Sequence, residues 1–255
     1  MATKKVIIDN RMRQIEKQKL QNMGFEIIEV QTNPNVYTEI SSHVDISVCK
    51  IENEIIVEPT QNMNNISNKI YGKERISAEY PHDIKYNVCI IGKKAIHNLK
   101  YTDEILKKEL LDKGFELINT TQGYTNCSIA VIDENSAIVT DKGLNKILQR
   151  HGIETLYLNN ELDIKLLNGN KYSNKKGFIG GCISRIDNKI MVFGELKKID
   201  SENKIRKFIQ EKNLEIIDFN GLDIIDYGGL IEVEWNDTKI YKNKRYRNTY
   251  KYKKL

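Results

Sequence analysis

The chain has 255 residues, of which 40% are hydrophobic and 29% charged, and this composition excludes bulk disorder and collagen-like structure. Its apolar runs are far shorter than the roughly 18 residues of a membrane-spanning helix, and the N-terminal apolar stretch is too short for a secretory signal. The 40 basic and 35 acidic residues give a formal net charge of +5. We therefore expect a cytoplasmic globular protein that makes no membrane contact.

Four segments repeat one pattern, in which an amphipathic helix ends at Gly or Asn and a strand-like alternation of apolar and polar residues follows. They are residues 20–28, 110–118, 148–156 and 209–217, with the helix ends at Gly24, Gly114, Gly152 and Asn213. Gly and Asn accept the left-handed conformation that often ends a helix. The long gap after the first copy predicts a degenerate copy that stops at Gly72. Thr102 is expected to cap the helix that ends before Gly114.

Between these helices the sequence predicts β-hairpins. Residues 43–57, 124–139 and 180–193 each hold two strand-like runs around a polar turn, and residues 86–96 form a shorter version. Residues 226–235 supply only the opening strand of a fifth hairpin, and residues 6–30 supply the rest of that unit. The two ends of the chain are therefore expected to share one unit and close a ring, which would leave no free sheet edge.

These repeats predict an α/β fold in which five ββαβ units form a closed, pseudo-fivefold propeller within a single domain, residues 1–240. Residues 241–255 form a basic tail with seven Lys and Arg and no acid, which leaves a formal charge of −2 on the other 240 residues. A body without basic excess gives no reason to expect binding to duplex nucleic acid. The tail alternates basic residues with Tyr, a composition that suits single-stranded RNA; the interpretation we favour is a solvated terminus.

The predicted architecture resembles the pentein fold of the guanidine-modifying enzymes, which include arginine and agmatine deiminases, dimethylarginine hydrolases and amidinotransferases, together with a non-enzymatic ribosome-binding factor. Three phrases, Gly-Tyr-Thr-Asn-Cys-Ser at 123–128, Asp-Glu-Asn-Ser-Ala-Ile-Val-Thr at 133–140 and Gly-Phe-Ile-Gly-Gly at 177–181, are similar to an uncharacterised bacterial family with this fold. The resemblance implies a site in which a thiolate attacks a guanidinium carbon, a His moves protons and carboxylates hold the cation.

The sequence His43-Val44-Asp45 matches the His-x-Asp pattern of the deiminases, and we expect both side chains on one face of a strand. The resemblance places the family nucleophile near the C-terminus, where residues 226–235 contain no Cys. Gly228 and Gly229 resemble the tight loop before that nucleophile. The usual catalytic thiol is therefore missing from its expected position.

The four cysteines show no paired spacing, and we expect each in the first strand of a separate unit, as a small buried hydrophobe. They are Cys49, Cys89, Cys127 and Cys182. Aligning the repeats places Asn126 and Gly180 level with Asp45, so Cys127 is the thiol candidate nearest the His-x-Asp end of the ring. A reactive thiol would need a partly exposed, electropositive setting.

Other residues are weaker candidates. Glu39 precedes the His-x-Asp segment and could join Asp45 around a cation, or lie in a solvated loop. The glycines of 177–181 match neither a phosphate loop nor a dinucleotide fingerprint, so we expect a close backbone approach there, and no cofactor or metal. His97 and His151 are expected at a strand edge and a helix end, in structural or solvated roles.

Two classes of function follow, and a third, a structural interaction protein with no small ligand, is kept beside them. In the first, a central pocket binds a small guanidino or amino-acid-like ligand and modifies it, with His43, Asp45 and Cys127 as catalytic residues. Its ligand-binding residues would be Glu39, Asn126, Gly180, Gly228 and Gly229. In the second, the fold is a non-catalytic module that binds protein or RNA. The missing C-terminal Cys favours binding over catalysis, and the His-x-Asp pair favours a working pocket.

Overall fold

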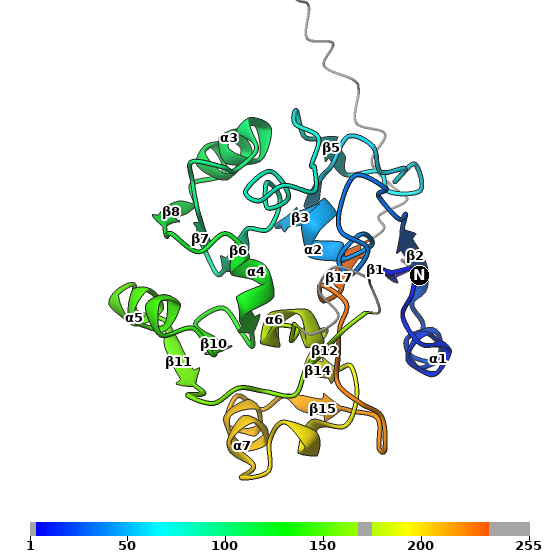
Figure 1. The fold of residues 1–255 in the computed structure, drawn as a ribbon, viewed down its shortest axis with the longest axis vertical. Coiled ribbons are helices and arrows are strands. Elements are labelled where there is room, and N and C mark those ends of the chain that lie inside the picture. The colour runs from blue at the N-terminus through cyan, green and yellow to red at the C-terminus, as the bar shows by residue number, and fades with distance from the viewer. Residues whose placement is uncertain (1–3, 168–174, 235–255) are drawn as a thin grey trace, which may run out of the picture.

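The computed structural model describes residues 4–167 and 175–234, so the predicted basic tail at 241–255 lies outside the described residues. These residues form five three-stranded sheets and one two-stranded sheet (Figure 1). In each three-stranded sheet a central strand pairs antiparallel with one neighbour and parallel with the other. The predicted mixed α/β class is confirmed.

Each three-stranded sheet corresponds to one predicted unit. The sheets are β17 (Ile231–Glu234), β1 (Lys4–Asp9) and β2 (Glu26–Val30); β3 (Val48–Ile51), β4 (Glu54–Val57) and β5 (Lys69–Tyr71); β6 (Cys89–Ile91), β7 (Lys94–His97) and β8 (Glu116–Asn119); β9 (Ile129–Val131), β10 (Ser136–Val139) and β11 (Glu154–Tyr157); and β13 (Ile183–Ile186), β14 (Lys189–Val192) and β15 (Glu215–Ile217). The two-stranded sheet pairs β12 (Lys165–Leu166) with β16 (Ile225–Asp226).

The pairing of β17 with β1 brings both ends of the described chain into one sheet, with Ile7 opposite Ile231. The sequence predicts this shared unit, but its opening strand begins at Ile231 and not at Asp226, because Asp226 belongs to β16. Within residues 4–167 and 175–234 no sheet closes on itself; the sheets remain separate.

Longer helices connect the central strand to the third strand in four of the five units. They are α1 (Gln14–Asn22), α3 (Glu104–Asp112), α5 (Lys142–Arg150) and α7 (Lys204–Gln210), the last preceded by the 3₁₀ turn η1 (Leu196–Lys198). The predicted stops follow them in the left-handed conformation, with φ of +90° at Gly24, +72° at Gly114, +74° at Gly152 and +57° at Asn213. Figure 1 shows these helices at the periphery of the molecule.

Two local predictions were wrong. Asp103 caps α3, since its side chain accepts hydrogen bonds from two backbone N–H groups of the first turn, while the Thr102 hydroxyl bonds to the His97 ring. In the second unit no described helix separates β4 from β5, and Gly72 follows β5. A β-carbon at Gly72 would lie 2.2 Å from the Tyr86 hydroxyl oxygen, so this glycine makes room for a tyrosine and does not end a helix.

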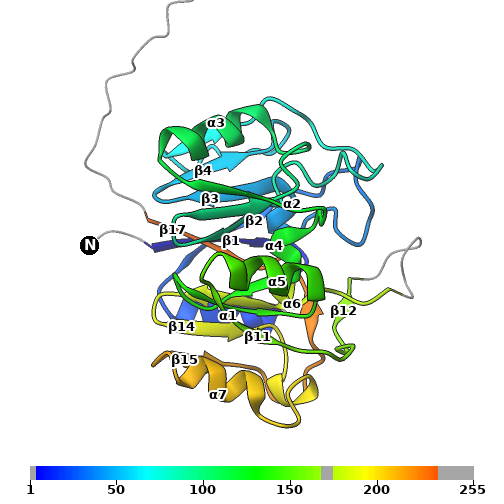
Figure 2. The same ribbon diagram turned by 90° about the vertical axis from the view of Figure 1, so that its left-hand side faces the viewer.

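The predicted hairpins begin with short helices, and this corrects the expected start of three first strands. α2 (Val44–Ser47), α4 (Thr125–Ser128) and α6 (Ile179–Cys182) lie near the centre of the molecule in Figure 1. In Figure 2 they lie toward the side opposite the N-terminus. The backbones of α4 and α6 pack closely, because a β-carbon at Gly180 would lie only 2.2 Å from the carbonyl oxygen of Asn126.

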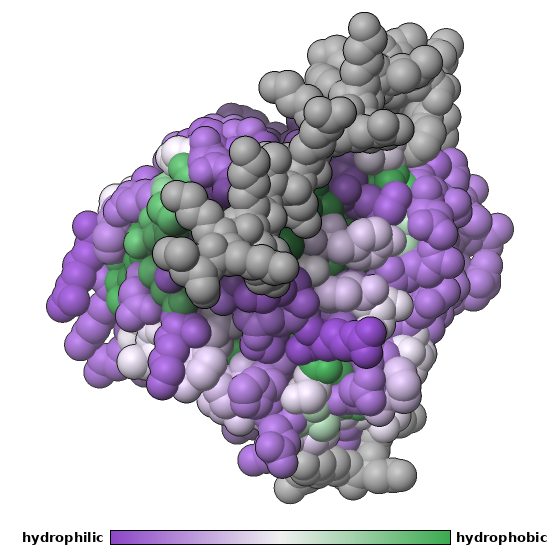
Figure 3. Space-filling model, turned by 90° about the horizontal axis from the view of Figure 1, so that it is seen from above, coloured by the Kyte–Doolittle hydropathy of each residue, from purple (hydrophilic) through white to green (hydrophobic). Residues whose placement is uncertain are grey.

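Buried apolar side chains pack between neighbouring sheets. One cluster joins Ala130 of β9 to Ile183 of β13 and Ile205 of α7, and another joins Val6 of β1 to Met191 of β14. The face in Figure 3 is mostly hydrophilic, with apolar residues in small separate patches. Of the helices in the described ranges, none has the length and hydropathy to cross a membrane.

Candidate functional site

His43 and Asp45 lie at the start of α2 and not on a strand, and both side chains are buried. The backbone N–H groups of Val44 and Asp45 donate to the carbonyls of Tyr227 and Gly228 at 3.4 and 3.3 Å. Gly228 has a φ of +68°, and a β-carbon there would lie 2.6 Å from Asp45 Oδ1 and from the His43 β-carbon. Gly228 therefore lets the C-terminal segment pack directly on the His-x-Asp turn.

Cys127 in α4 contacts this turn. Its Sγ donates to Asp45 Oδ2 at 2.8 Å and accepts a hydrogen bond from Asn87 Nδ2 at 3.1 Å. Asn126 Nδ2 lies 3.5 Å from the same Asp45 oxygen, and Asn87 Oδ1 accepts from the Asn126 backbone N–H at 2.9 Å. Asn87 could not be predicted from the sequence, because no local pattern marks an asparagine that bridges two distant turns.

Electrostatics keep the Cys127 thiol protonated. Burial raises the pKa of Asp45 to about 6; nearby His43 lowers this pKa and Asp226 raises it further. Burial also raises the pKa of the Cys127 thiol well above its ordinary value, and the carboxylates of Asp45 and Asp226 add to that shift. At neutral pH the group is therefore a thiol, a weak nucleophile.

Asp226 is a further functional candidate that the sequence analysis missed. Its Oδ1 lies 3.7 Å from His43 Nδ1, and its Oδ2 accepts a hydrogen bond from the Phe178 backbone N–H at 2.8 Å. Neither His43 ring nitrogen has a hydrogen-bond partner within the described ranges. A β-carbon at Gly181 would lie 1.7 Å from Asp226 Oδ1. Gly177 and Gly181 thus make room for the buried Asp226 carboxylate. These closely spaced glycines were the only sign in the sequence of a buried group at this position.

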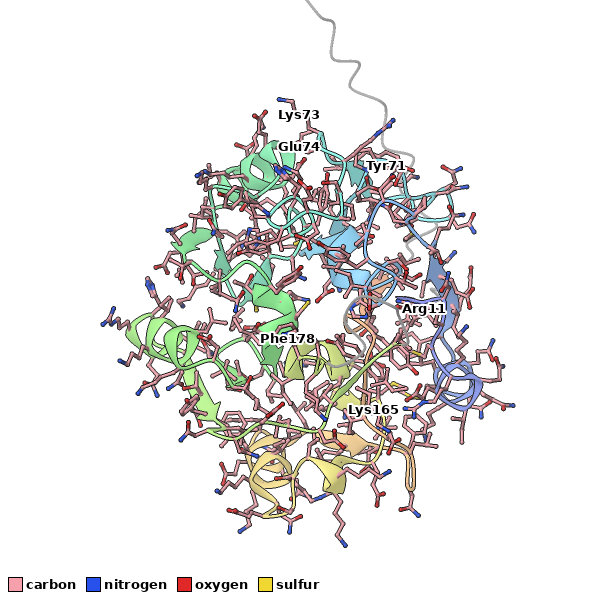
Figure 4. The ribbon with its side chains drawn as sticks, in the orientation of Figure 1. Arg11, Tyr71, Lys73, Glu74, Lys165 and Phe178 are labelled. Atoms are coloured by element: carbon pink, nitrogen blue, oxygen red, sulfur yellow. The ribbon has the colours of Figure 1, made fainter. Side chains whose placement is uncertain are left out.

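His43, Cys127 and Asp226 line a cavity of about 330 Å³. Two carboxylates, one histidine, one cysteine, two lysines, four aromatic rings and two aliphatic side chains surround it: Glu39 and Asp226; His43; Cys127; Lys175 and Lys176; Tyr37, Tyr80, Tyr124 and Phe178; Ile40 and Leu166. The Tyr124 ring centroid lies 5.9 Å from that of Tyr80 and 6.1 Å from that of Phe178, and Figure 4 shows Phe178 near the centre of the molecule. Such a cavity, apolar with a few converging polar groups, is typical of a small-ligand site.

The structure separates the predicted site residues. His43, Cys127 and Glu39 line the cavity described above. The other predicted ligand-binding residues, Asn126, Gly180, Gly228 and Gly229, line a second cavity of about 440 Å³. Asp45 lines neither cavity and contacts a residue from each, Cys127 and Asn126.

The cavity that holds His43 and Cys127 is not lined by Cys49, Cys89 or Cys182, nor by His97 or His151. Cys49 and Cys89 are buried in first strands as predicted, but Cys182 and Cys127 lie in short helices. Burial raises the pKa of Cys49 to about 12. His97 is fully buried between the Thr102 hydroxyl and the Gly123 carbonyl, and burial lowers its pKa to about 4. His151, just past α5, pairs with the Glu116 carboxylate. No metal-ligating group of three or more side chains occurs within residues 4–167 and 175–234.

Solved structures with similar folds are guanidine-modifying enzymes. A dimethylarginine dimethylaminohydrolase variant in an adduct with S-methyl-L-thiocitrulline is 8% identical, with a TM-score of 0.55, over 92% of this chain and 100% of that one. A cysteine-to-serine variant of the Pseudomonas aeruginosa enzyme, in complex with citrulline, has the same identity and coverage and a TM-score of 0.52. An amidinotransferase of saxitoxin biosynthesis from Microseira wollei is 11% identical, with a TM-score of 0.50, over 88% of this chain and 89% of that one.

At these low identities the structural similarity shows a shared fold alone. No curated protein matches the sequence. The model of a family of unknown function, DUF6873, matches residues 7–231. The chain therefore belongs to the DUF6873 family and has the pentein fold of the guanidine-modifying enzymes.

Proposed function

We propose that the cavity lined by Glu39, His43, Cys127 and Asp226 binds a small guanidino or amino-acid-like cation. One observation carries this proposal: two carboxylates from distant parts of the chain line a single, largely apolar cavity, and the Asp45 carboxylate lies directly behind Cys127. A planar guanidinium is best held by paired carboxylate acceptors, and its attraction to them is strengthened where aromatic side chains exclude water.

The proposed architecture for this site is a closed, pseudo-fivefold propeller of five ββαβ units, formed by residues 1–240 as one domain. The shared strand order of the five sheets and the pairing of β17 with β1 support it. In such a ring, one central turn from each of several units would converge on the site. The short helices α2, α4 and α6 would be these turns.

Modification of the bound cation is a second candidate function, supported by the position of Cys127 and His43 in one cavity. The thiol proton would pass to Asp45, and Sγ would form a bond to the guanidinium carbon. His43 would give a proton to the departing amine as its bond to that carbon breaks. Water would then add to the carbon, giving one proton back to His43 and one to the released ammonia, and the carbon–sulfur bond would break to leave a urea product. The departing thiolate would take back the proton held by Asp45. A cation beside Asp226 would offset the negative charge that raises the thiol pKa.

Binding without chemistry is the alternative, and the raised pKa of the Cys127 thiol supports it. The segment after Gly229 supports it as well, because residues 230–234 contain no Cys. Replacement of Cys127 by Ala separates the two candidates. Release of ammonia or urea from a guanidino substrate should disappear in Cys127→Ala if this thiol is the nucleophile, and release that survives would exclude it.

A thermal-shift screen with L-arginine, agmatine and Nω-methyl-L-arginine tests the binding proposal. A ligand at 100 times its Kd stabilises the folded protein by about 2.7 kcal/mol. The shift should vanish in Asp226→Asn and persist in Asp223→Asn, whose side chain pairs with Lys165 and Lys198 away from the cavity. No shift with any of the three compounds at millimolar concentration would contradict the proposal.

A further inference from the structure

The segment that follows β1 carries an arginine with a distinctive set of contacts, Arg11 (Figure 4). Its Nε and Nη2 donate to the two carboxylate oxygens of Asp9 at 3.0 and 2.7 Å, and Asp9 is fully buried. Its Nη1 donates to the Thr38 carbonyl at 2.5 Å and Nη2 to the Glu39 carbonyl at 3.3 Å. One guanidinium therefore joins strand β1 to the backbone that carries Glu39.

The loop held by Arg11 supplies much of the cavity wall. Tyr37, Glu39, Ile40 and His43 all line the cavity and all come from residues 37–43. Backbone hydrogen bonds tie the loop together, from Ile40 N–H to Tyr37 C=O and from His43 N–H to Ile40 C=O, both at 3.0 Å. Because these hydrogen bonds link the loop internally, a displacement of the Thr38 or Glu39 backbone should move all of residues 37–43 together.

We propose that Arg11 is a positioning residue that fixes the wall formed by residues 37–43 against the cavity and so keeps Cys127 covered. Arg11 does not line the cavity itself, and it acts through the Thr38 and Glu39 carbonyls. The buried Asp9 carboxylate holds the guanidinium in the orientation that reaches them.

An arginine is required by this geometry. The planar Arg11 guanidinium donates four hydrogen bonds in two directions. Two go to the Asp9 carboxylate and two go to the loop carbonyls. A lysine ammonium is a point charge that cannot reproduce a bidentate pair and bridge to two carbonyls at the same time. Arg11→Lys should therefore keep the charge and lose most of the positioning, and Arg11→Met should lose both.

The first test is the alkylation of Cys127 by iodoacetamide in the full chain, followed at each cysteine by peptide mass spectrometry. Cys127 lines the same cavity as the wall and is 3% exposed, so faster modification of this thiol would report opening of the wall. Arg11→Met should raise its rate by about tenfold or more, with a smaller rise in Arg11→Lys. Lys5→Met is the matched control, since Lys5 on the same strand joins Glu26 to the Asn65 carbonyl of a loop that does not line the cavity.

The other buried thiols distinguish local opening from general loss of stability. A rise confined to Cys127 supports the proposal, whereas equal rises at Cys49, Cys89 and Cys182, or no rise, would overturn it. If Arg11→Met does not fold, Arg11→Lys is judged by the same comparison. The second test is the Kd of L-arginine, which should rise about tenfold in Arg11→Lys and stay constant in Lys5→Met. Only this second test rests on the proposed function; if the native chain binds no guanidino compound, alkylation alone decides.

Discussion

Replacement of Asp45 by Asn should stabilise the protein at neutral pH while removing a functional group. The native carboxyl is 2% exposed, and burial raises its pKa from 3.8 to about 6. A carboxyl whose pKa is higher in the folded state favours folding only while it is protonated. Its contribution is therefore present below pH 4 and is lost as the pH rises through 6.

The pKa shift of Asp45 sets the size of the stability gain expected in Asp45→Asn. A difference of about 2 pKa units corresponds to about 3 kcal/mol at pH 8, where the group is ionised in both states. At pH 5 the same pKa shift lowers the free energy of unfolding by about half that amount. Asn keeps a side-chain oxygen that can accept the hydrogen bond from Cys127 Sγ, so the neutral variant retains this contact. For a chain of this length, about 3 kcal/mol corresponds to a rise in Tm of roughly 6 to 12 °C.

Urea unfolding at pH 5 and pH 8 measures this prediction. Asp45→Asn should be more stable than the native protein at both values, and its advantage should be about 1.5 kcal/mol larger at pH 8. Asp9→Asn is the matched control, because it removes a buried carboxylate that is paired with Arg11 and should destabilise the protein. A loss of stability in Asp45→Asn that is equal at both pH values would refute the reasoning, since its carboxylate would then be stabilised by its contacts.

Three further substitutions or deletions test the fold around the site. Because burial lowers the pKa of His97 to about 4, the His97 contribution to native stability should fall by up to about 3 kcal/mol as the pH drops from 6.5 to 4. Urea titrations should therefore show the native protein losing about that much stability relative to His97→Asn, since the opposite slope from Asp45 is common to both proteins. Gly181→Ala should weaken binding and lower the Tm measured by calorimetry, because its β-carbon would lie 1.7 Å from Asp226 Oδ1; an unchanged Tm would contradict the packing. A chain truncated after Gly221 should be unfolded by circular dichroism, because it lacks β17 and leaves β1 without its antiparallel partner; a cooperative unfolding transition in that chain would disagree.

The sequence predicts the parts of the fold that depend on local conformation. Gly24, Gly114 and Gly152 end their helices because the left-handed conformation needs a glycine or asparagine, and this requirement is visible in the residue itself. The pairing of the chain ends was also predictable, because an unfinished repeat at one terminus requires its complement at the other.

The features that the sequence did not predict depend on tertiary contacts. Over the four residues that begin at Val44, an apolar–polar alternation fits a strand and a single helical turn equally well, and packing against Gly228 selects the turn. The repeat alignment placed Asn126 and Cys127 one step apart, but in a helical turn adjacent side chains point in different directions. They therefore line different cavities. Asp226 was missed because its partners, His43 and Phe178, are far away in the sequence.

Isothermal titration of L-arginine into the native protein and into Asp226→Asn tests the central claim most directly. If the carboxylates of the cavity bind a guanidinium, the native chain should bind one equivalent and the variant should bind at least about tenfold more weakly, as expected when one partner of a buried charge pair is removed. Asp223→Asn should match the native protein, because its side chain lies outside the cavity. Equal affinity in the native and Asp226→Asn proteins, or no binding by the native chain at millimolar concentration, would contradict the account.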